Sequence, residues 1–408
     1  MKKLLLASAA IAGLTATAQA ASHANEVKIG IILGFTGPIE SLTPAMAAGA
    51  EMAMSEVTES GMLMDGATVT PVRADSTCVD SGAATAAAER LITSEGVKGI
   101  MGADCSGVTG AILTNVAVAN GMVMISPSAT SPGLSTAEDD GLFFRTAPSD
   151  ARQGVVMTEV LMDQGIESVA VTYTNNDYGK GLADSFQQAF EAAGGTVTIS
   201  AAHEDGKADY SAEVGALASA GGDRLVVAGY VDQGGAGIVR GALDTGAFDT
   251  FHFPDGMIGA ALEENFGSEL DGSTGQVPGT DSPGATRFAE AVGDTFDPTG
   301  PYTGESYDAA ALIMLAMQAA GSVEPGDYKT KVMEVANAPG EKIYPGELGK
   351  ALELIAAGTD IDYVGATNVE LIGPGEASGS YREIVFEGQH GRWRCVCACD
   401  QAREGSAD

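Results

Sequence analysis

The sequence predicts an α/β fold with two lobes, each built from parallel strands flanked by helices. The chain has 408 residues, about twice the length of an ordinary domain. From Glu26 onwards, short apolar runs rich in β-branched residues alternate with longer helical patterns, and the alternation begins again after residue 147. Continuous apolar runs between helices are typical of strands buried on both faces of a parallel sheet.

The first lobe opens with an expected strand at residues 27–33. A helix should follow, with Thr43 as its N-cap, Pro44 in its first turn and Gly61 as its stop. The Ala-rich segment 83–93 favours another helix, because Ala has the highest helix propensity. Further strands are expected at residues 68–74, 97–102, 122–126 and 142–146.

The second lobe is expected to begin with a helix at residues 153–162. Its strands are predicted at residues 168–173, 197–200 and 224–229, and a late strand at 381–386. From about residue 275 to 321 the pattern is mostly helical. Segment 306–321 is apolar on most faces, which predicts a buried helix. No low-complexity linker separates the lobes, so short ordered crossovers should join them.

The charge balance excludes several classes of partner. Lys and Arg total 21 against 55 Asp and Glu, which gives a net charge of −34. Such a chain has no basic face for a phosphate backbone or an anionic bilayer, so neither nucleic acid nor membrane is an expected partner. The four histidines lack the spacings of a catalytic metal site, and there is no P-loop or dinucleotide fingerprint. No metal and no cofactor are therefore expected.

Residues 1–20 have the form of a cleaved secretory signal peptide. Lys2 and Lys3 precede a short apolar stretch, which ends in Ala-Gln-Ala at residues 18–20. The alternative is a membrane anchor, but the apolar stretch is shorter than the roughly 20 residues that span a bilayer. Export to the periplasm of a Gram-negative cell is the expectation.

The cysteines form two groups that call for separate interpretations. Cys78 and Cys105 either form a disulfide, which an exported protein permits, or remain buried free thiols. Cys395, Cys397 and Cys399 stand close together near the end of the chain. This spacing, with no neighbouring histidine, is incomplete for zinc, and we interpret residues 391–408 as an atypical, disordered tail.

Several segments, taken together, resemble a known family. They are GIILGFTGP (30–38), SGAATAAAERLI (81–92), GADCSGVTGAI (102–112), ISPSATSPGL (125–134), FRTAPSDARQG (144–154), YTNNDYGKGLADSF (173–186) and SYDAAALIMLAMQAAG (306–321). Their order and spacing behind a secretion signal are similar to those of the leucine/isoleucine/valine-binding group of periplasmic solute-binding proteins. The resemblance covers roughly residues 26–390.

The resemblance implies two Rossmann-like lobes joined by a three-crossover hinge, with the ligand cleft between them. Lobe 1 is expected to comprise residues 26–147 plus 277–379, and lobe 2 residues 148–276 plus 380–390. It also implies that Cys78 and Cys105 form a disulfide, as several family members have one at these positions. Such a bond would fix the loop that carries Ser106.

The candidate carboxylate site lies on the first lobe. Ser106 follows a strand and opens a helix, where a hydroxyl and free amides can receive an anion. By resemblance, the segment Ser128, Ala129 and Thr130 forms a second clamp, which holds the carboxylate and the amine of the ligand. The competing interpretation is that these hydroxyls only cap helices.

The second lobe supplies the other candidate ligand-binding residues. Tyr178 and Tyr230 resemble tyrosines that close over the ligand, where a ring covers apolar surface and a phenol forms hydrogen bonds. Asp255 stands where amino-acid binders of the family carry an acid, often glutamate, that pairs with the ammonium group. The alternatives are tyrosines packed on their own lobe and a surface aspartate.

The resemblance implies a monomeric periplasmic binding protein, without catalytic residues, that delivers an amino acid to an ABC importer. Its expected partners are that amino acid, with branched-chain ones leading, and the transporter's permease and ATPase. Three alternatives remain open. One is another small polar ligand, such as an amide, urea or an aromatic acid, and another is a periplasmic hydrolase of the same two-lobed form. The third is a sensory ligand-binding domain, although such domains are usually fused to a membrane segment.

Overall fold

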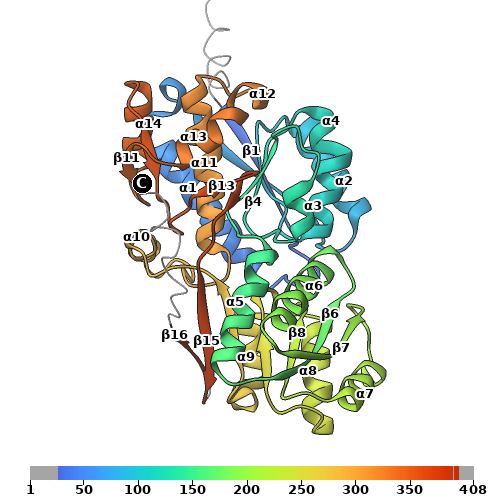
Figure 1. The fold of residues 1–408 in the computed structure, drawn as a ribbon. Coiled ribbons are helices and arrows are strands. Elements are labelled where there is room, and N and C mark those ends of the chain that lie inside the picture. The colour runs from blue at the N-terminus through green and yellow to red at the C-terminus, as the bar shows by residue number, and fades with distance from the viewer. Residues whose placement is uncertain (1–25, 389, 395–408) are drawn as a thin grey trace, which may run out of the picture.

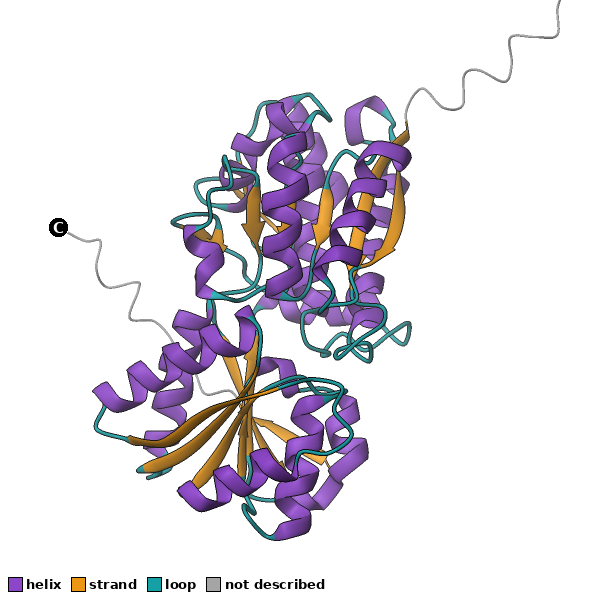
Figure 2. Cartoon of the chain, turned by 90° about the vertical axis from the view of Figure 1, so that its right-hand side faces the viewer, coloured by secondary structure: helices purple, strands orange, loops and turns teal. Residues whose placement is uncertain are grey.

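The computed structural model describes residues 26–388 and 390–394. These residues form two lobes, each with a central sheet covered by helices (Figure 1 and Figure 2). The expected signal peptide at 1–20 and the cysteines Cys395, Cys397 and Cys399 lie outside the described residues.

The sheet of lobe 1 is built mainly from the first part of the chain. Its strands are β1 (Glu26–Leu33), β2 (Thr68–Asp75), β3 (Ile100–Gly102), β4 (Met124–Ser126), β5 (Phe143–Arg145), β13 (Leu371–Ile372) and β14 (Glu376–Ala377). They lie in the order β13-β14-β5-β4-β3-β1-β2. Strands β1 to β5 pair in parallel, as predicted, while β13 and β14 form an antiparallel edge.

The sheet of lobe 2 has the order β16-β15-β10-β9-β8-β6-β7. Its strands are β6 (Ser168–Thr174), β7 (Thr196–His203), β8 (Arg224–Ala228), β9 (Phe251–Phe253), β10 (Thr274–Pro278), β15 (Tyr381–Glu387) and β16 (His390–Arg394). Strands β6 to β10 pair in parallel, and β15 and β16 add an antiparallel edge. Two further strands, β11 (Glu341–Ile343) and β12 (Ile361–Tyr363), pair separately.

Helices cover both sheets (Figure 1). They are α1 (Thr43–Ser60), α2 (Ser81–Arg90), α3 (Ser106–Ile112), α4 (Val118–Asn120), α5 (Asp150–Asp163), α6 (Asp177–Ala192), α7 (Ser211–Ala220), α8 (Gly234–Thr245), α9 (Ala260–Phe266), α10 (Pro283–Val292), α11 (Thr303–Ala320), α12 (Pro325–Tyr328), α13 (Val332–Ala336) and α14 (Leu348–Ala356). No helix of the described residues is both long and apolar enough to cross a membrane.

The start of α1 differs from the prediction. Leu42, not Thr43, is the N-cap, and no side chain caps this end of the helix. The Thr43 hydroxyl instead donates to the carbonyl oxygens of Gly34 and Glu40, both at 3.3 Å, which ties the helix to the loop after β1. The predicted stop at Gly61 is confirmed, because this residue adopts a left-handed conformation with φ of 63°.

The segment from residue 275 is not helical at its beginning, contrary to the prediction. Strand β10 occupies this position although Gly275 and Pro278 are poor strand formers. The strand forms because β9 and β15 pair with it on its two sides. The predicted buried helix is confirmed as α11, in which every residue from 305 to 317 is buried.

The last strand changes one expected boundary. Residues 391–394, which we assigned to the tail, belong to β16 and pair with β15 in antiparallel register. Without β16, strand β15 would be the edge of this sheet. The chain turns back at Gly388, which has a left-handed φ of 78°, and β16 then pairs along that edge.

Candidate functional site

Two loops that carry predicted site residues leave the same edge of the lobe 1 sheet. One follows β3 and leads through Asp104 into α3, and the other follows β4 at Ser126. Because β3 and β4 are adjacent and parallel, their carboxyl ends lie side by side. The Ser128 hydroxyl donates to the backbone oxygen of Asp104 at 3.1 Å, which joins the two loops.

Buried hydrogen bonds hold both loops in place. The Asp104 carboxylate accepts from the backbone nitrogen of Gly34 at 2.6 Å and from the Ser76 hydroxyl at 2.9 Å. The Ser106 hydroxyl accepts from the backbone nitrogen of Ser131 at 3.0 Å. The serine hydroxyls therefore have fixed positions that do not depend on a ligand.

The implied disulfide is present. The sulfurs of Cys78 and Cys105 are bonded, and both residues are buried. Cys105 is the N-cap of α3 and precedes Ser106 directly. The bond therefore links the loop after β2 to the start of the helix that carries Ser106.

Ala129 and Thr130 lie deeper than the two serines. The backbone nitrogen of Ala129 donates to the Ser126 hydroxyl at 2.9 Å, and its oxygen accepts from Arg145 at 3.0 Å. Both backbone groups of Ala129 are thus engaged inside lobe 1. The Thr130 hydroxyl is buried and has no hydrogen-bond partner of normal geometry among the described residues.

The predicted residues of lobe 2 converge from three strand ends. Tyr178 lies in the first turn of α6, Tyr230 follows β8, and Asp255 follows β9 in a short 3₁₀ turn. The rings of Tyr178 and Tyr230 stack with centroids 5.2 Å apart. The Tyr178 hydroxyl donates to Asp255 Oδ1 at 2.7 Å, and all three residues are buried.

The Asp255 carboxylate is also contacted by residues that the sequence analysis did not single out. Tyr302, at the start of α11 in lobe 1, donates its phenol to Oδ2, so this hydrogen bond joins the lobes. With the Gln153 amide oriented so that its nitrogen faces acceptors, Nε2 donates to Asp255 at 3.2 Å and to Asp150 at 3.0 Å. Asp150 is therefore a second buried acid beside Asp255.

The two buried acids have raised pKa values. Burial raises the pKa of Asp255, although hydrogen bonds from Tyr302 and Tyr178 act in the opposite direction. Burial and the charge of Asp255 together raise the pKa of Asp150 well above its usual range. A cation placed against this pair would be stabilised, because it would compensate the desolvated carboxylates.

The residues from both lobes enclose one small cavity of about 20 Å³. Its polar walls come from Asp104, Ser106 and Ser128 on one side, and from Asp255 and the tyrosines on the other. Its lining residues are Ile39, Leu42, Asp104, Cys105, Ser106, Ser128, Tyr178, Tyr230, Asp255, Gly256 and Tyr302. Five of the seven predicted ligand-binding residues thus share one cavity, and Ala129 and Thr130 do not line it.

The sequence carried only partial signals for Asp150, Gln153 and Tyr302, the residues around Asp255 that the sequence analysis did not single out. Asp150 and Gln153 belong to the quoted segment FRTAPSDARQG, but nothing in its pattern shows that they face Asp255. Tyr302 has a positive φ of 62°, which is uncommon for a residue other than glycine, and it follows Pro301 in an irregular segment. Its role depends on the docking of one lobe against the other.

A comparison with protein families identifies the group to which this chain is related. The family model described as periplasmic binding protein matches residues 26–340. The chain belongs to this family. The match covers most of both lobes, including every predicted ligand-binding residue.

Individual relatives agree with the periplasmic binding protein assignment. A substrate-binding protein of a chemotactic signal transduction system in Halobacterium salinarum is 32% identical over 85% of this chain and 83% of its own. A leucine-, isoleucine-, valine-, threonine- and alanine-binding protein of Pseudomonas aeruginosa is 28% identical over 85% of this chain and 90% of its own. The crystal structure of a leucine-binding protein from Thermotoga maritima has a TM-score of 0.76 at 23% identity, covering 90% of this chain and 97% of its own, and shows the same fold.

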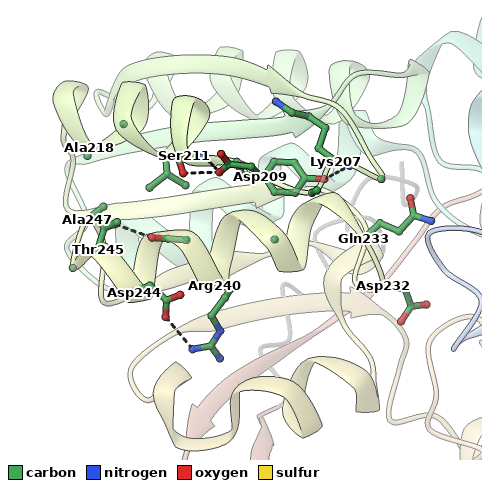
Figure 3. Close-up of a pocket in the computed structure, with 18 residues that line it drawn as sticks. Lys207, Asp209, Ser211, Ala218, Asp232, Gln233, Arg240, Asp244, Thr245 and Ala247 are labelled. Carbon is green, nitrogen blue, oxygen red and sulfur yellow. Dashed lines mark hydrogen bonds and ion pairs between the residues drawn. The ribbon is translucent and has the colours of Figure 1, made fainter.

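A larger groove lies elsewhere in the part of the chain that the structure describes. It has a volume of about 1020 Å³ and runs between α7 and α8 on lobe 2 (Figure 3). Arg240 in this groove pairs with Asp244 at 3.6 Å, and Lys207 pairs with Glu213. None of the predicted site residues lines it. The predicted site residues of this periplasmic binding protein therefore lie away from this larger groove.

Proposed function

We propose that this protein binds a free α-amino acid between its lobes, with branched-chain amino acids as the leading class, and delivers it unchanged to an ABC importer. One observation carries the proposal. Two serines of lobe 1 and a buried aspartate of lobe 2 line a single cavity. This arrangement is complementary to a zwitterion, whose opposite charges need different partners.

In this proposal the carboxylate of the ligand binds to lobe 1. The Ser106 hydroxyl, which accepts from Ser131 and keeps its own hydrogen, serves as a donor together with the amides at the start of α3. Ser128, whose hydroxyl donates to the backbone oxygen of Asp104, lines the same wall. The ammonium binds to Asp255, with Asp150 close behind it. Tyr178 and Tyr230 cover the ligand from lobe 2.

Ligand entry requires the lobes to separate, because a cavity of about 20 Å³ has room for little more than one water molecule. We propose the division into residues 26–147 plus 277–379 and residues 148–276 plus 380–390, with the three crossovers as the hinge. The ligand favours the closed form to the extent that it contacts both lobes at once.

The proposed location and partners follow from the family. Residues 1–20 would direct the chain to the periplasm and be removed there. The closed, ligand-bound form would then dock on the permease of an ABC transporter, whose ATPase drives import.

The ligand class rests on the similarity to proteins named for leucine, isoleucine and valine. It is tested by isothermal titration calorimetry of the mature protein with all common amino acids, and with amides, urea and benzoate. Saturable binding of leucine, isoleucine or valine is the expected result. Binding of amides, urea or benzoate alone, or turnover of an amide or ester, would refute the proposal.

The role of Asp255 is tested by Asp255→Asn, which keeps the shape of the side chain and removes its charge. We expect affinity for leucine to fall by about 100-fold or more, because the ammonium would lose its buried counter-charge. Asp209→Asn changes an exposed acid in the same lobe and should bind like the wild type. Unchanged affinity of Asp255→Asn would argue for a ligand without an ammonium group.

A second candidate function is supported by the relative from a chemotactic signalling system. We propose that a signalling receptor also recognises the ligand-bound form. A deletion strain would then lose attraction to the ligand as well as its uptake. A strain that loses uptake but keeps normal attraction would exclude this second function.

A further inference from the structure

A second pocket, of about 450 Å³, lies beside the ligand cavity and is lined by both lobes. Leu42 lines both hollows, so they adjoin at this residue. We call this second pocket the annex. Because its walls come from lobe 1 and lobe 2 alike, it is complete only when the lobes are together.

The polar ends of the proposed ligand determine where its side chain points. Ser106 and Ser128 take one end, and Asp255 takes the other. Apart from the tyrosine rings, the apolar side chains left in the cavity wall include Ile39 and Leu42. The side chain of an amino acid held by both ends therefore faces Ile39 and Leu42, and Leu42 also lines the annex.

On the annex side, Leu42 packs closely against lobe 2. Leu42 Cδ2 lies 2.7 Å from the point that a Cβ atom at Gly259 would occupy, so the leucine of lobe 1 abuts the backbone of lobe 2. Only a glycine allows this approach. Leu42 is unbranched at Cβ, and its side chain can change rotamer without moving the backbone.

The walls of the annex are chiefly apolar. Ile258, Ile384 and Phe386 contribute from lobe 2, and Leu42, Ala45 and Pro301 from lobe 1. Two acids, Glu263 and Asp297, also line it, and Asp297 already accepts hydrogen bonds from Thr299. An apolar group entering the annex would be removed from water on several sides.

We propose that the annex is a subsite for the outer part of the ligand side chain, and that it admits apolar α-amino acids longer than leucine when Leu42 swings aside. The inference rests on the proposed function and deepens it, because it names the side-chain class. Each methylene group that enters the annex should improve affinity about fourfold.

The test compares L-norleucine, L-2-aminoheptanoate and L-2-aminooctanoate by calorimetry. In the wild type, affinity should rise with chain length. Ala260→Trp and Thr299→Trp fill the annex from lobe 2 and from lobe 1, starting from exposed residues, and each should abolish the rise while leaving leucine binding intact. Ala218→Trp, an equally exposed site on α7, is the matched control and should behave like the wild type.

The outcomes separate this inference from the proposed function. Two outcomes would overturn the annex alone. One is normal leucine binding with an affinity that falls as the ligand chain lengthens. The other is an affinity that rises with chain length in both filling variants as it does in the wild type. Lysine has a side chain of the same length as that of 2-aminoheptanoate. Tighter binding of lysine would overturn the apolar assignment, because Glu263 and Asp297 would then determine which side chain binds. Failure of every amino acid to bind would instead remove the proposed function and the annex with it.

Discussion

Tyr302 gives the acid of lobe 2 a partner on lobe 1. Its phenol donates to Asp255 Oδ2, and both residues are buried. Separation of the lobes breaks this hydrogen bond, whereas the bond from Tyr178 stays within lobe 2. Tyr302 is therefore a positioning residue that helps to hold Asp255 in place only in the closed form.

We expect Tyr302→Phe to weaken leucine binding about tenfold, or about 1.4 kcal/mol, because the closed form loses one buried hydrogen bond to a carboxylate. Calorimetry measures the effect. The matched control is Tyr363→Phe, which removes a phenol from Asp308 within lobe 1, at 2.8 Å. That variant should lose thermal stability and keep its affinity. Equal affinities for both variants would show that Tyr302 does not favour closure.

Glu305 lies near the first crossover and should make stability depend on pH. The residue is buried, and burial is the main cause that raises its pKa from 4.5 to about 8. Its backbone oxygen accepts from the Thr146 hydroxyl at 2.8 Å. The folded chain keeps a proton on Glu305 where the unfolded chain has lost it, so this contribution to stability is full below about pH 4.5 and is lost as the pH rises through 8.

Glu305→Gln removes this titration while keeping the shape of the side chain. By pH 8 the variant should be more stable than the wild type by about 4 kcal/mol, and the difference should shrink towards pH 5. Urea denaturation at three pH values measures it. A difference in unfolding free energy that is constant across this range would contradict the assignment.

The sequence predicted those site residues that stand at the ends of recognisable strands. Ser106 and Tyr178 stand in the first turn of helices that follow predicted strands, so their neighbourhood is local. Asp255 follows β9, which the pattern did not predict, and only the family resemblance singled it out. Asp150 and Tyr302 owe their positions to contacts between distant segments, and a single sequence carries no signal for such contacts. Ala129 illustrates a third case, because its backbone groups turn inward to Ser126 and Arg145.

At the scale of single elements, the disulfide stabilises the loops around Ser106. The two cysteines are 27 residues apart. Closing a loop of this length lowers the entropy of the unfolded chain, which raises the free energy of unfolding by about 3.5 kcal/mol in the chain-entropy account.

We expect the Cys78→Ala/Cys105→Ala double variant to unfold at lower urea concentration, with a loss of about 3 kcal/mol. Its affinity for leucine should fall as well, because the start of α3 would have to be ordered on binding. Wild-type protein reduced with dithiothreitol should match the variant in both respects. A variant that loses stability but keeps full affinity would show that the disulfide does not preorganise the site.

The elements themselves were predictable where local pattern and tertiary context agree. Strand β1 is apolar from residue 29 to 33 and helix α11 from residue 309 to 317, and the burial of these runs in the structure is the direct consequence. Strands β9 and β10 are short and contain His, Gly, Gln and Pro. They exist because the neighbouring strands pair with them, so pattern alone could not reveal them.

At the scale of the whole molecule, the lobes also touch at the mouth of the cleft. The Asp232 carboxylate of lobe 2 accepts from the backbone nitrogen of Ser41 in lobe 1 at 2.8 Å. Its backbone nitrogen donates to the oxygen of Pro38 at 3.1 Å. These contacts, like the one from Tyr302, exist only while the lobes are together, and none of them involves the proposed ligand.

The balance between open and closed forms should therefore shift in opposite directions with ligand and with loss of these contacts. We expect leucine to reduce the radius of gyration in small-angle X-ray scattering, since the ligand contacts both lobes. Asp232→Ala should be more open without ligand and bind leucine about fivefold more weakly, because one hydrogen bond to a charged group is lost. At saturating leucine the variant and the wild type should reach the same radius, because the ligand then determines the population. A radius that does not change with leucine in either protein, despite binding, would show that the lobes do not close around the ligand and that the site is filled by local rearrangement instead.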